Sequence, residues 1–306
     1  MQVLQVERTP ARPGPGPIPE QLLRALDVTI GRRMQGLLAG DYRSALLGDG
    51  TELAQIRAYQ AGDDVRHIDW NVTARTGEPH VRVYQAERVL VTWLVLDASP
   101  SMRFGTADRR KIDVAEGVAI ATGHVATRRG NRLGVVTFGG AHPEAVPPNQ
   151  GRAGLLGLLG TLHAGDDNGS GRLGATSLGE AVRRTDALAH QRSLVVIASD
   201  FRGPQDWHRP LLHLSGRHDV FAVEIRDPRE QELPNAGELW LVDPETGKQL
   251  RVDTRSEKLR RRFAEAAAEE RRALAKKLAS VGVRHVVLTT SGDWLRRYAH
   301  FLRRTR

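Results

Sequence analysis

From Val89 onward, apolar residues alternate between short continuous runs and longer segments with helical spacing. The short runs have the length and apolar content of strands that are buried on both faces of a sheet. These predicted strands are Val89–Asp97, Arg132–Phe138, Leu194–Asp200, Val220–Ile225 and Val283–Thr289. The segments between them predict helices at Lys111–Arg128, Leu155–Leu162, Ser177–Ala189, Trp207–Leu214, Glu257–Val281 and Trp294–Leu302. Strands that alternate with helices predict an α/β fold, in which helices cover both faces of a mainly parallel sheet.

The residues before Val89 follow a different pattern, which predicts an accessory segment. Residues 1–19 contain five prolines and few residues that could form a core, so we expect a flexible tail. Apolar residues then recur at helical spacing from Pro19 to Leu47, and the sequence VRVYQAE predicts an edge strand. The expected organisation is a tail over 1–19, an N-terminal accessory segment over 20–88 and an α/β domain over 89–306. The C-terminal part of that domain adds a hairpin around Pro244–Gly247, a basic helix, a strand and a closing helix.

The composition narrows the class of protein. Hydrophobic residues make up 40% of the 306 residues, which is enough for a buried core. The chain has no cysteine, which excludes disulfides, thiolate metal ligands and cysteine nucleophiles. No apolar run approaches the ~20 residues of a transmembrane helix, and no signal peptide is apparent. We therefore expect a soluble, cytoplasmic protein.

The positive charge is concentrated at the C-terminal end. The net charge is +9, and residues 251–306 carry 16 Lys and Arg against 6 Asp and Glu. Such a balance could attract nucleic acid, an anionic membrane or an acidic protein surface, or it could simply belong to a solvated helix. Aromatic residues in this region stand mostly at core spacing, so nucleic-acid binding through the basic helices is the alternative rather than the main hypothesis.

Oxygen-bearing side chains follow two of the predicted strands. Asp97 ends the first strand, and Ser99 and Ser101 follow it in a DxSxS pattern, so one carboxylate and two hydroxyls can point at one centre. Asp200 ends another strand, and Thr176 stands where a helix begins. Hard oxygen ligands of this kind suit Mg²⁺ or Mn²⁺. Alternatively, Asp97 and Ser99 could brace the turn or cap a helix.

These five residues resemble the metal-ion-dependent adhesion site of von Willebrand factor A domains, in the order and contexts that this family uses. The resemblance covers roughly Val89 to Ile225. It implies a Rossmann-like, von Willebrand factor A-type domain, in which the DxSxS residues and the threonine bind the ion directly or through water. It also implies that Asp200 acts through water and that an acidic side chain of a protein partner takes the remaining coordination position.

An upstream motif resembles the signature of the domain-of-unknown-function-58 family, whose members join such a segment to an A-type domain. The matching residues are Arg57, Tyr59, Gly62, Asp63, Asp64, Arg66, Asp69, Trp70 and Arg75. The resemblance implies a MoxR-type AAA+ ATPase as the partner, in the assembly or maturation of a complex. Many members carry N-terminal membrane helices, whereas no transmembrane segment is expected in this chain.

Clustered carboxylates in that motif also permit a metal-dependent hydrolase that uses Asp63, Asp64 and Asp97. In the alternative that we favour, the GDD sequence forms a turn, and Asp69 and Arg66 pair with neighbours such as Arg75 or Asp63. Trp70 would then anchor the segment. The sequence has no phosphate-binding loop of the GxxxxGK[ST] type, no HExxH and no GxSxG around Ser99. We therefore expect a non-catalytic, divalent-metal-dependent protein–protein interaction module.

Overall fold

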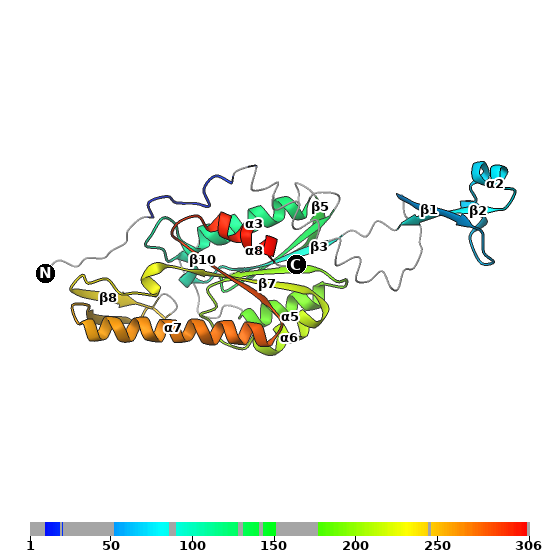
Figure 1. The fold of residues 1–306 in the computed structure, drawn as a ribbon. Helices are drawn as coiled ribbons and strands as arrows, with labels where there is room; N and C mark the ends of the chain where they lie inside the picture. The colour runs from blue at the N-terminus through cyan, green and yellow to red at the C-terminus, as the bar shows by residue number, and fades with distance from the viewer. Residues whose placement is uncertain are drawn as a thin grey trace. The chain divides into compact units, whose positions relative to one another are not determined.

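A central β-sheet positions the site in the computed structural model (Figure 1). In the part of the chain that the structure describes, six strands form this sheet in the order β10-β7-β6-β3-β4-β5. Their bounds are β3 Val91–Asp97, β4 Arg132–Phe138, β5 Ala145–Gln150, β6 Leu194–Ser199, β7 Asp219–Arg226 and β10 Arg284–Thr289. All neighbouring strands pair in parallel, except that β5 pairs antiparallel with β4 at one edge. The prediction of a mainly parallel α/β sheet is confirmed, and β5 is a strand that the apolar pattern did not predict.

The structure describes residues 10–18, 20, 52–85, 90–127, 131–140, 143–150, 177–243 and 246–304. The chain divides into two units, one formed by Met1–Arg33 with Leu90–Arg306 and the other by Met34–Val89. Nearly all of the helix predicted from Pro19 to Leu47 lies outside the described residues, as does the whole of Leu155–Leu162.

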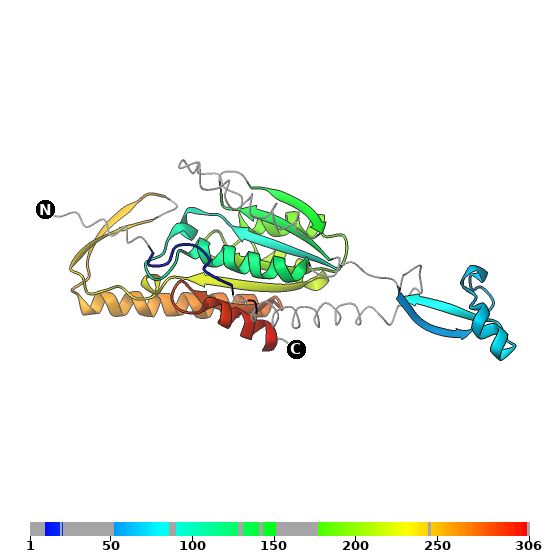
Figure 2. The same ribbon diagram turned by 90° about the horizontal axis from the view of Figure 1, so that it is seen from above.

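Helices cover both faces of the sheet. Two views place α3 (Lys111–Ala126) and α8 (Trp294–Arg304) on one face (Figures 1 and 2). The opposite face carries α5 (Leu178–Leu188), α6 (His208–Arg217) and α7 (Glu257–Ser280). Because both faces are covered, the residues of β3 are buried along its whole length. The strand end therefore presents Asp97 at the rim of a rigid core.

The helix α3 is buried on two sides, because it packs against the sheet and also against α8, its neighbour on the same face (Figure 2). The hydroxyl groups of Thr122 and Tyr298 join the two helices by a buried hydrogen bond of 2.8 Å. Gly117 leaves room for the ring of Trp294, since a Cβ atom at this position would lie 2.4 Å from that ring. Close packing of this kind fixes the position of α3 and of Lys111, the first residue of the helix.

Other segments extend the larger unit. The predicted hairpin is present as β8 (Glu238–Val242) paired antiparallel with β9 (Gln249–Asp253). Residues 10–18 belong to the expected tail, yet the backbone N–H of Arg12 donates to the carbonyl of Asp108 at 2.7 Å. The guanidinium of Arg109 in turn donates to the carbonyl of Gly14 at 2.7 Å. This part of the tail is therefore hydrogen-bonded to the loop that precedes α3.

The smaller unit is built on a two-stranded antiparallel sheet of β1 (Glu52–Ala58) and β2 (His80–Gln85). Between these strands lie the 3₁₀ turn η2 (Val65–His67) and the short helix α2 (Trp70–Thr76). The predicted edge strand corresponds to β2. Sequence patterns did not predict α2, because seven residues are too short for a clear helical period.

Candidate functional site

Asp97 lies at the carboxyl end of β3, where the chain turns sharply. The backbone N–H of Ser99 donates to Asp97 Oδ1 at 2.9 Å, and the hydroxyl of Ser199 donates to Asp97 Oδ2 at 2.5 Å. The 3₁₀ turn η3 (Pro100–Arg103) follows, with proline at its first position. Gly139 allows the loop after β4 to approach, because a Cβ atom there would lie 2.9 Å from Ser99. The turn thus holds both carboxylate oxygens of Asp97 in fixed directions.

Four of the five predicted ligands form one row of hydrogen-bonded side chains. The hydroxyl of Ser99 hydrogen-bonds to Asp97, and the hydroxyl of Ser101 hydrogen-bonds to Asp200. The hydroxyl oxygens of Ser99 and Ser101 lie 3.0 Å apart. Either serine can donate to the other, and two hydroxyl protons serve three contacts, so one contact of the row has no proton and its two oxygens face each other through lone pairs. A hard cation would satisfy such a set of oxygens.

The fifth predicted ligand, Thr176, lies outside the described residues. Its neighbour Ser177 caps α5, accepting a hydrogen bond from the backbone N–H of Glu180 at 3.2 Å. The hydroxyl of Ser177 also donates to Asp206 at 2.5 Å. The helix start that was expected beside Thr176 is therefore present.

A buried lysine adjoins the row. Lys111 is fully buried, and its Nζ donates to Asp200 Oδ2 and to Glu230 Oε1, each at 2.6 Å. Glu230 belongs to η5 (Pro228–Glu230), the turn that follows β7. Asp200 Oδ1 accepts a hydrogen bond from the backbone N–H of Arg202 at 3.0 Å. Both oxygens of Asp200 are thus engaged by the protein.

The two carboxyl groups of the row differ in their electrostatic surroundings. Burial, together with the negative charge of Asp200, raises the pKa of Asp97 to about 6. Burial alone would also raise the pKa of Asp200, but the charge and hydrogen bond of Lys111 bring that pKa below its usual value. Asp200 therefore already has a cationic partner, whereas the described surroundings of Asp97 supply only hydrogen-bond donors.

Sequence reasoning missed three members of the site, namely Lys111, Ser199 and Glu230. Lys111 follows Arg109 and Arg110, and such a run resembles the solvent-exposed start of a helix. Ser199 precedes Asp200 at the end of a buried strand, where its polarity was the one available signal. Nothing in the sequence around Glu230 distinguishes it from a surface residue.

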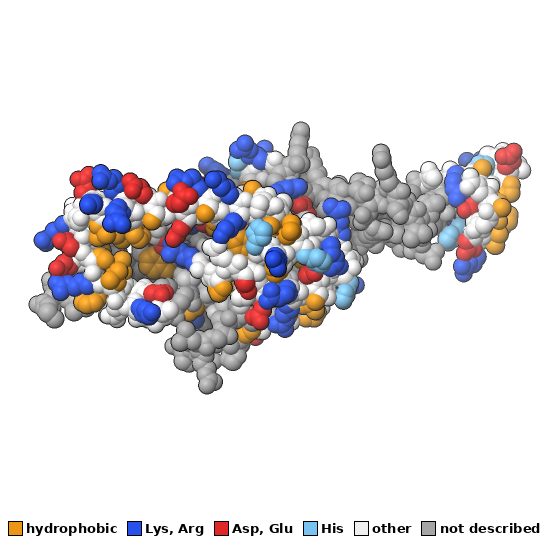
Figure 3. All heavy atoms as spheres, turned by 90° about the horizontal axis from the view of Figure 1, so that it is seen from below, with side chains coloured by type: hydrophobic (Ala, Val, Ile, Leu, Met, Phe, Trp, Pro, Cys, Tyr) orange, Lys and Arg blue, Asp and Glu red, His pale blue; other side chains and the backbone are white. Residues whose placement is uncertain are grey.

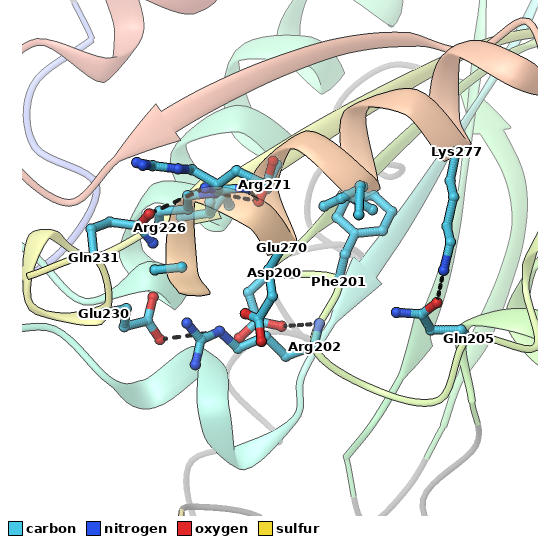
Figure 4. Close-up of a pocket in the computed structure, with 15 residues that line it drawn as sticks. Asp200, Phe201, Arg202, Gln205, Arg226, Glu230, Gln231, Glu270, Arg271 and Lys277 are labelled. Carbon is cyan, nitrogen blue, oxygen red and sulfur yellow. Dashed lines mark hydrogen bonds and ion pairs between the residues drawn. The ribbon is translucent and has the colours of Figure 1, made fainter. Parts of the chain in front are cut away.

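A cavity of about 340 Å³ opens beside Asp200 (Figure 4). Phe201, which follows Asp200 and lines the cavity, has a φ of 56°, an uncommon backbone conformation for a bulky residue. Its backbone N–H donates to the hydroxyl of Ser199 at 2.9 Å, which helps to hold this conformation. Basic residues from three elements line the cavity, namely Arg202, Arg226, Arg271 and Lys277. The acidic lining residues are Asp200, Glu224, Glu230 and Glu270.

The carboxylates of the GDD motif are engaged in ion pairs of the smaller unit. Asp63 accepts two hydrogen bonds from Arg57, each of 2.8 Å. Asp64 caps η2 and pairs with Arg66 at 2.6 Å. The GDD sequence forms a turn as expected, but the pairing of Arg66 with Asp63 was wrong. Arg66 instead pairs with Asp64, the aspartate that is nearer to it in the sequence, and Asp63 pairs with Arg57.

The predicted partner of Asp69 was also wrong. Its carboxylate caps α2 and binds Arg82 at 2.8 Å, rather than Arg75. Trp70 begins α2 and its side chain is 71% exposed. Among the described residues, no three His, Cys, Asp or Glu side chains converge on one point as a metal centre of that type. The candidate site is of a different type, with two carboxylates and two hydroxyls.

Comparison with known proteins gives a family match. The model of the family described as "Protein of unknown function DUF58" matches residues 55–273. Uncharacterized protein Rv1480 of Mycobacterium tuberculosis is 40% identical over 283 residues, which are 92% of this chain and 87% of that protein. Uncharacterized protein Mb1516 of Mycobacterium bovis has the same identity and coverage. Uncharacterized protein MAV169 of Mycobacterium avium is 38% identical over 165 residues, covering 53% of this chain and 94% of that protein.

Two solved structures are similar at low sequence identity. One is the conserved hypothetical protein BatB from Bacteroides thetaiotaomicron, with 12% identity and a TM-score of 0.43, covering 70% of this chain and 97% of that chain. The other is an aerotolerance-related membrane protein from Bacteroides fragilis, with the same identity and TM-score, covering 70% and 96%. Among the described residues of the present chain, no helix is long and apolar enough to span a membrane.

Proposed function

This chain belongs to the DUF58 family, and we propose that it is a non-catalytic module that binds a protein partner through a divalent cation. The proposed cation is Mg²⁺ or Mn²⁺, held at a metal-ion-dependent adhesion site of the von Willebrand factor A type. Its protein ligands would be Asp97, Ser99, Ser101 and Thr176, with Asp200 acting through water.

The observation that supports this proposal most is the row of side chains from Asp97 to Asp200. It joins the carboxyl ends of the neighbouring parallel strands β3 and β6, which is where ligands bind in open α/β sheets. Its described members are all oxygen donors, as a hard cation requires. The described members of the row include no histidine, the usual general base for a serine nucleophile, which favours binding over hydrolysis.

Each residue has a distinct role in the proposed site. Asp97 supplies the main ionic contact, and Ser99 and Ser101 orient the cation. Asp200 is already bound to Lys111 and Arg202, so it would hold a metal-bound water rather than the ion itself. An acidic side chain of the partner would complete the coordination shell, and affinity for the partner would therefore depend on the ion. Family resemblance suggests a MoxR-type AAA+ ATPase as the partner.

Isothermal titration with Mg²⁺ and with Mn²⁺ tests the site. The wild type should bind one ion saturably, and Asp97→Ala should lose that binding while keeping its fold, because the residue lies at the sheet rim. Asp243→Ala, at the exposed hairpin, is the matched control and should bind like the wild type. Undiminished binding in Asp97→Ala would refute the assignment of this carboxylate.

A further inference from the structure

Lys111 places a positive charge inside the candidate site. Its side chain has no exposed surface, and its Nζ lies 2.6 Å from carboxylate oxygens of both Asp200 and Glu230. The guanidinium Nε of Arg202 lies 3.8 Å from the same oxygen of Glu230, but its side chain is 48% exposed. Asp97, Asp200, Glu230, Lys111 and Arg202 form the charged group of the site. Lys111 is its buried cation, and Arg202 is the cation that solvent screens.

Stability alone gives a weak reason for this arrangement. Burial of an ammonium group and its partners costs free energy that their mutual attraction only offsets, and apolar replacements of similar volume are often no less stable. The side chain of Lys111 reaches from the start of α3 to Oδ2 of Asp200, the carboxylate that also hydrogen-bonds to Ser101. Its charge therefore acts on the same carboxylate that would face the cation.

The charges of the site lead to a specific role. Asp97, Asp200 and Glu230 carry three negative charges, and Lys111 and Arg202 carry two positive ones, which leaves the metal-free group at −1. A divalent cation changes this net charge to +1, and one carboxylate ligand would bring it to zero. Without Lys111, the metal-loaded group would already be neutral, and attraction for an anion would be weaker.

We infer that Lys111 determines ligand specificity: it makes the metal-loaded site prefer a carboxylate over water in the remaining coordination position. This inference rests on the proposed function, which it deepens by assigning the partner's charge preference to one residue. Lys111 lowers affinity for the cation and raises affinity of the loaded site for an anion. Glu230 has the opposite effect on both, because its charge is opposite.

Two affinities test the inference in the full-length protein. Binding of Mn²⁺ is measured from the electron paramagnetic resonance signal of the free ion. Binding of acetate to the Mn²⁺-loaded protein is measured by water-proton relaxation, since acetate displaces metal-bound water. In Lys111→Met, Mn²⁺ should bind about tenfold more tightly and acetate about tenfold more weakly. In Glu230→Gln, Mn²⁺ should bind more weakly than in the wild type, and acetate should bind more tightly.

Opposite changes of affinity in the two variants distinguish the proposed electrostatic role of Lys111 from a purely structural one. Both variants break the same buried ion pair, so a loss of stability would change the affinities of both variants in the same direction. Thermal unfolding measures the stability of each variant. The double variant Lys111→Met/Glu230→Gln restores the net charge and should regain wild-type affinities. Lys248→Met, an exposed lysine of the hairpin, is the matched control and should change neither affinity.

The possible failures are distinguishable. If the wild type binds Mn²⁺ and acetate, but Lys111→Met and Glu230→Gln shift acetate binding in the same direction or not at all, the role of Lys111 is wrong and the metal site stands. If the wild type binds no Mn²⁺, or if acetate binding is equal in Asp97→Ala, the proposed function itself fails and this inference fails with it.

Discussion

At the scale of the residue, two carboxylates at strand ends, Asp97 and Asp200, differ in their electrostatic surroundings. Asp97 is buried with another carboxylate nearby, and its pKa rises to about 6 for that reason. A group of this kind destabilises a protein when ionised and becomes favourable when a cation binds, which is typical of sites that exchange stability for binding. Asp200 differs because Lys111 already neutralises it.

Asp97→Asn should therefore separate stability from binding. The amide keeps the acceptor for the Ser99 backbone N–H and can bond to Ser199, but it has no charge. Without metal at neutral pH, we expect this variant to unfold with a free energy about 1–2 kcal/mol higher than the wild type. Urea unfolding with and without Mg²⁺ measures this, and added Mg²⁺ should stabilise the wild type alone. A less stable metal-free variant would contradict the electrostatic description of Asp97.

Part of the site can be predicted from the sequence for a simple physical reason. Asp97, Ser99, Ser101 and Asp200 follow strands of one parallel sheet, so topology alone brings them to the same edge. Lys111 could not be found in this way, since its burial depends on how α3 lies against the sheet. A lysine at a helix start is usually exposed, and only tertiary packing shows otherwise.

At the scale of the element, the pair of helices α3 and α8 fixes one wall of the site. Tyr298 is completely buried between them, and burial raises the pKa of its hydroxyl to about 12. Thr122 supplies the hydrogen bond of this hydroxyl. The same packing holds Lys111, because it is the first residue of α3.

Tyr298→Phe tests how much the hydrogen bond between Tyr298 and Thr122 contributes to the free energy of unfolding. At pH 8 we expect the variant to lose about 1 kcal/mol, because the Thr122 hydroxyl loses its partner. The folded-state pKa of Tyr298 exceeds the unfolded value of about 10, so the wild type should lose stability as pH rises from about 10 to 12. Phenylalanine does not titrate, and the difference between the proteins should shrink at pH 11. Urea unfolding at both pH values checks this, and an unchanged difference would contradict it.

The edge strand β5 was not predicted because of its composition and its position. The strand β5 contains Pro147 and Pro148 and is partly exposed at the sheet edge, so it lacks the apolar run of a buried strand. The buried strands β3, β6 and β7 carry strong apolar runs, and their predicted bounds agree with the structure to within two residues. Strong apolar runs thus predict the strands that the core buries on both faces, and β5 has no such run.

At the scale of the whole molecule, charge and unit organisation limit the possible functions. The larger unit comprises Met1–Arg33 and Leu90–Arg306, and the smaller unit comprises Met34–Val89. On the face shown in Figure 3, which includes α7, Lys and Arg side chains are interspersed with those of Asp and Glu. A mixed surface of this kind supports nucleic-acid binding less than a continuous basic patch would.

Crystals grown with Mn²⁺ would test the central claim most directly, because the anomalous scattering of manganese locates the ion independently of any assumed site. We predict one strong anomalous peak bonded to oxygens of Asp97, Ser99 and Ser101, with Asp200 reached through a water. A peak at Asp63 and Asp64 instead, or no ordered peak beside Asp97 at saturating Mn²⁺, would contradict a metal-dependent adhesion site in this protein.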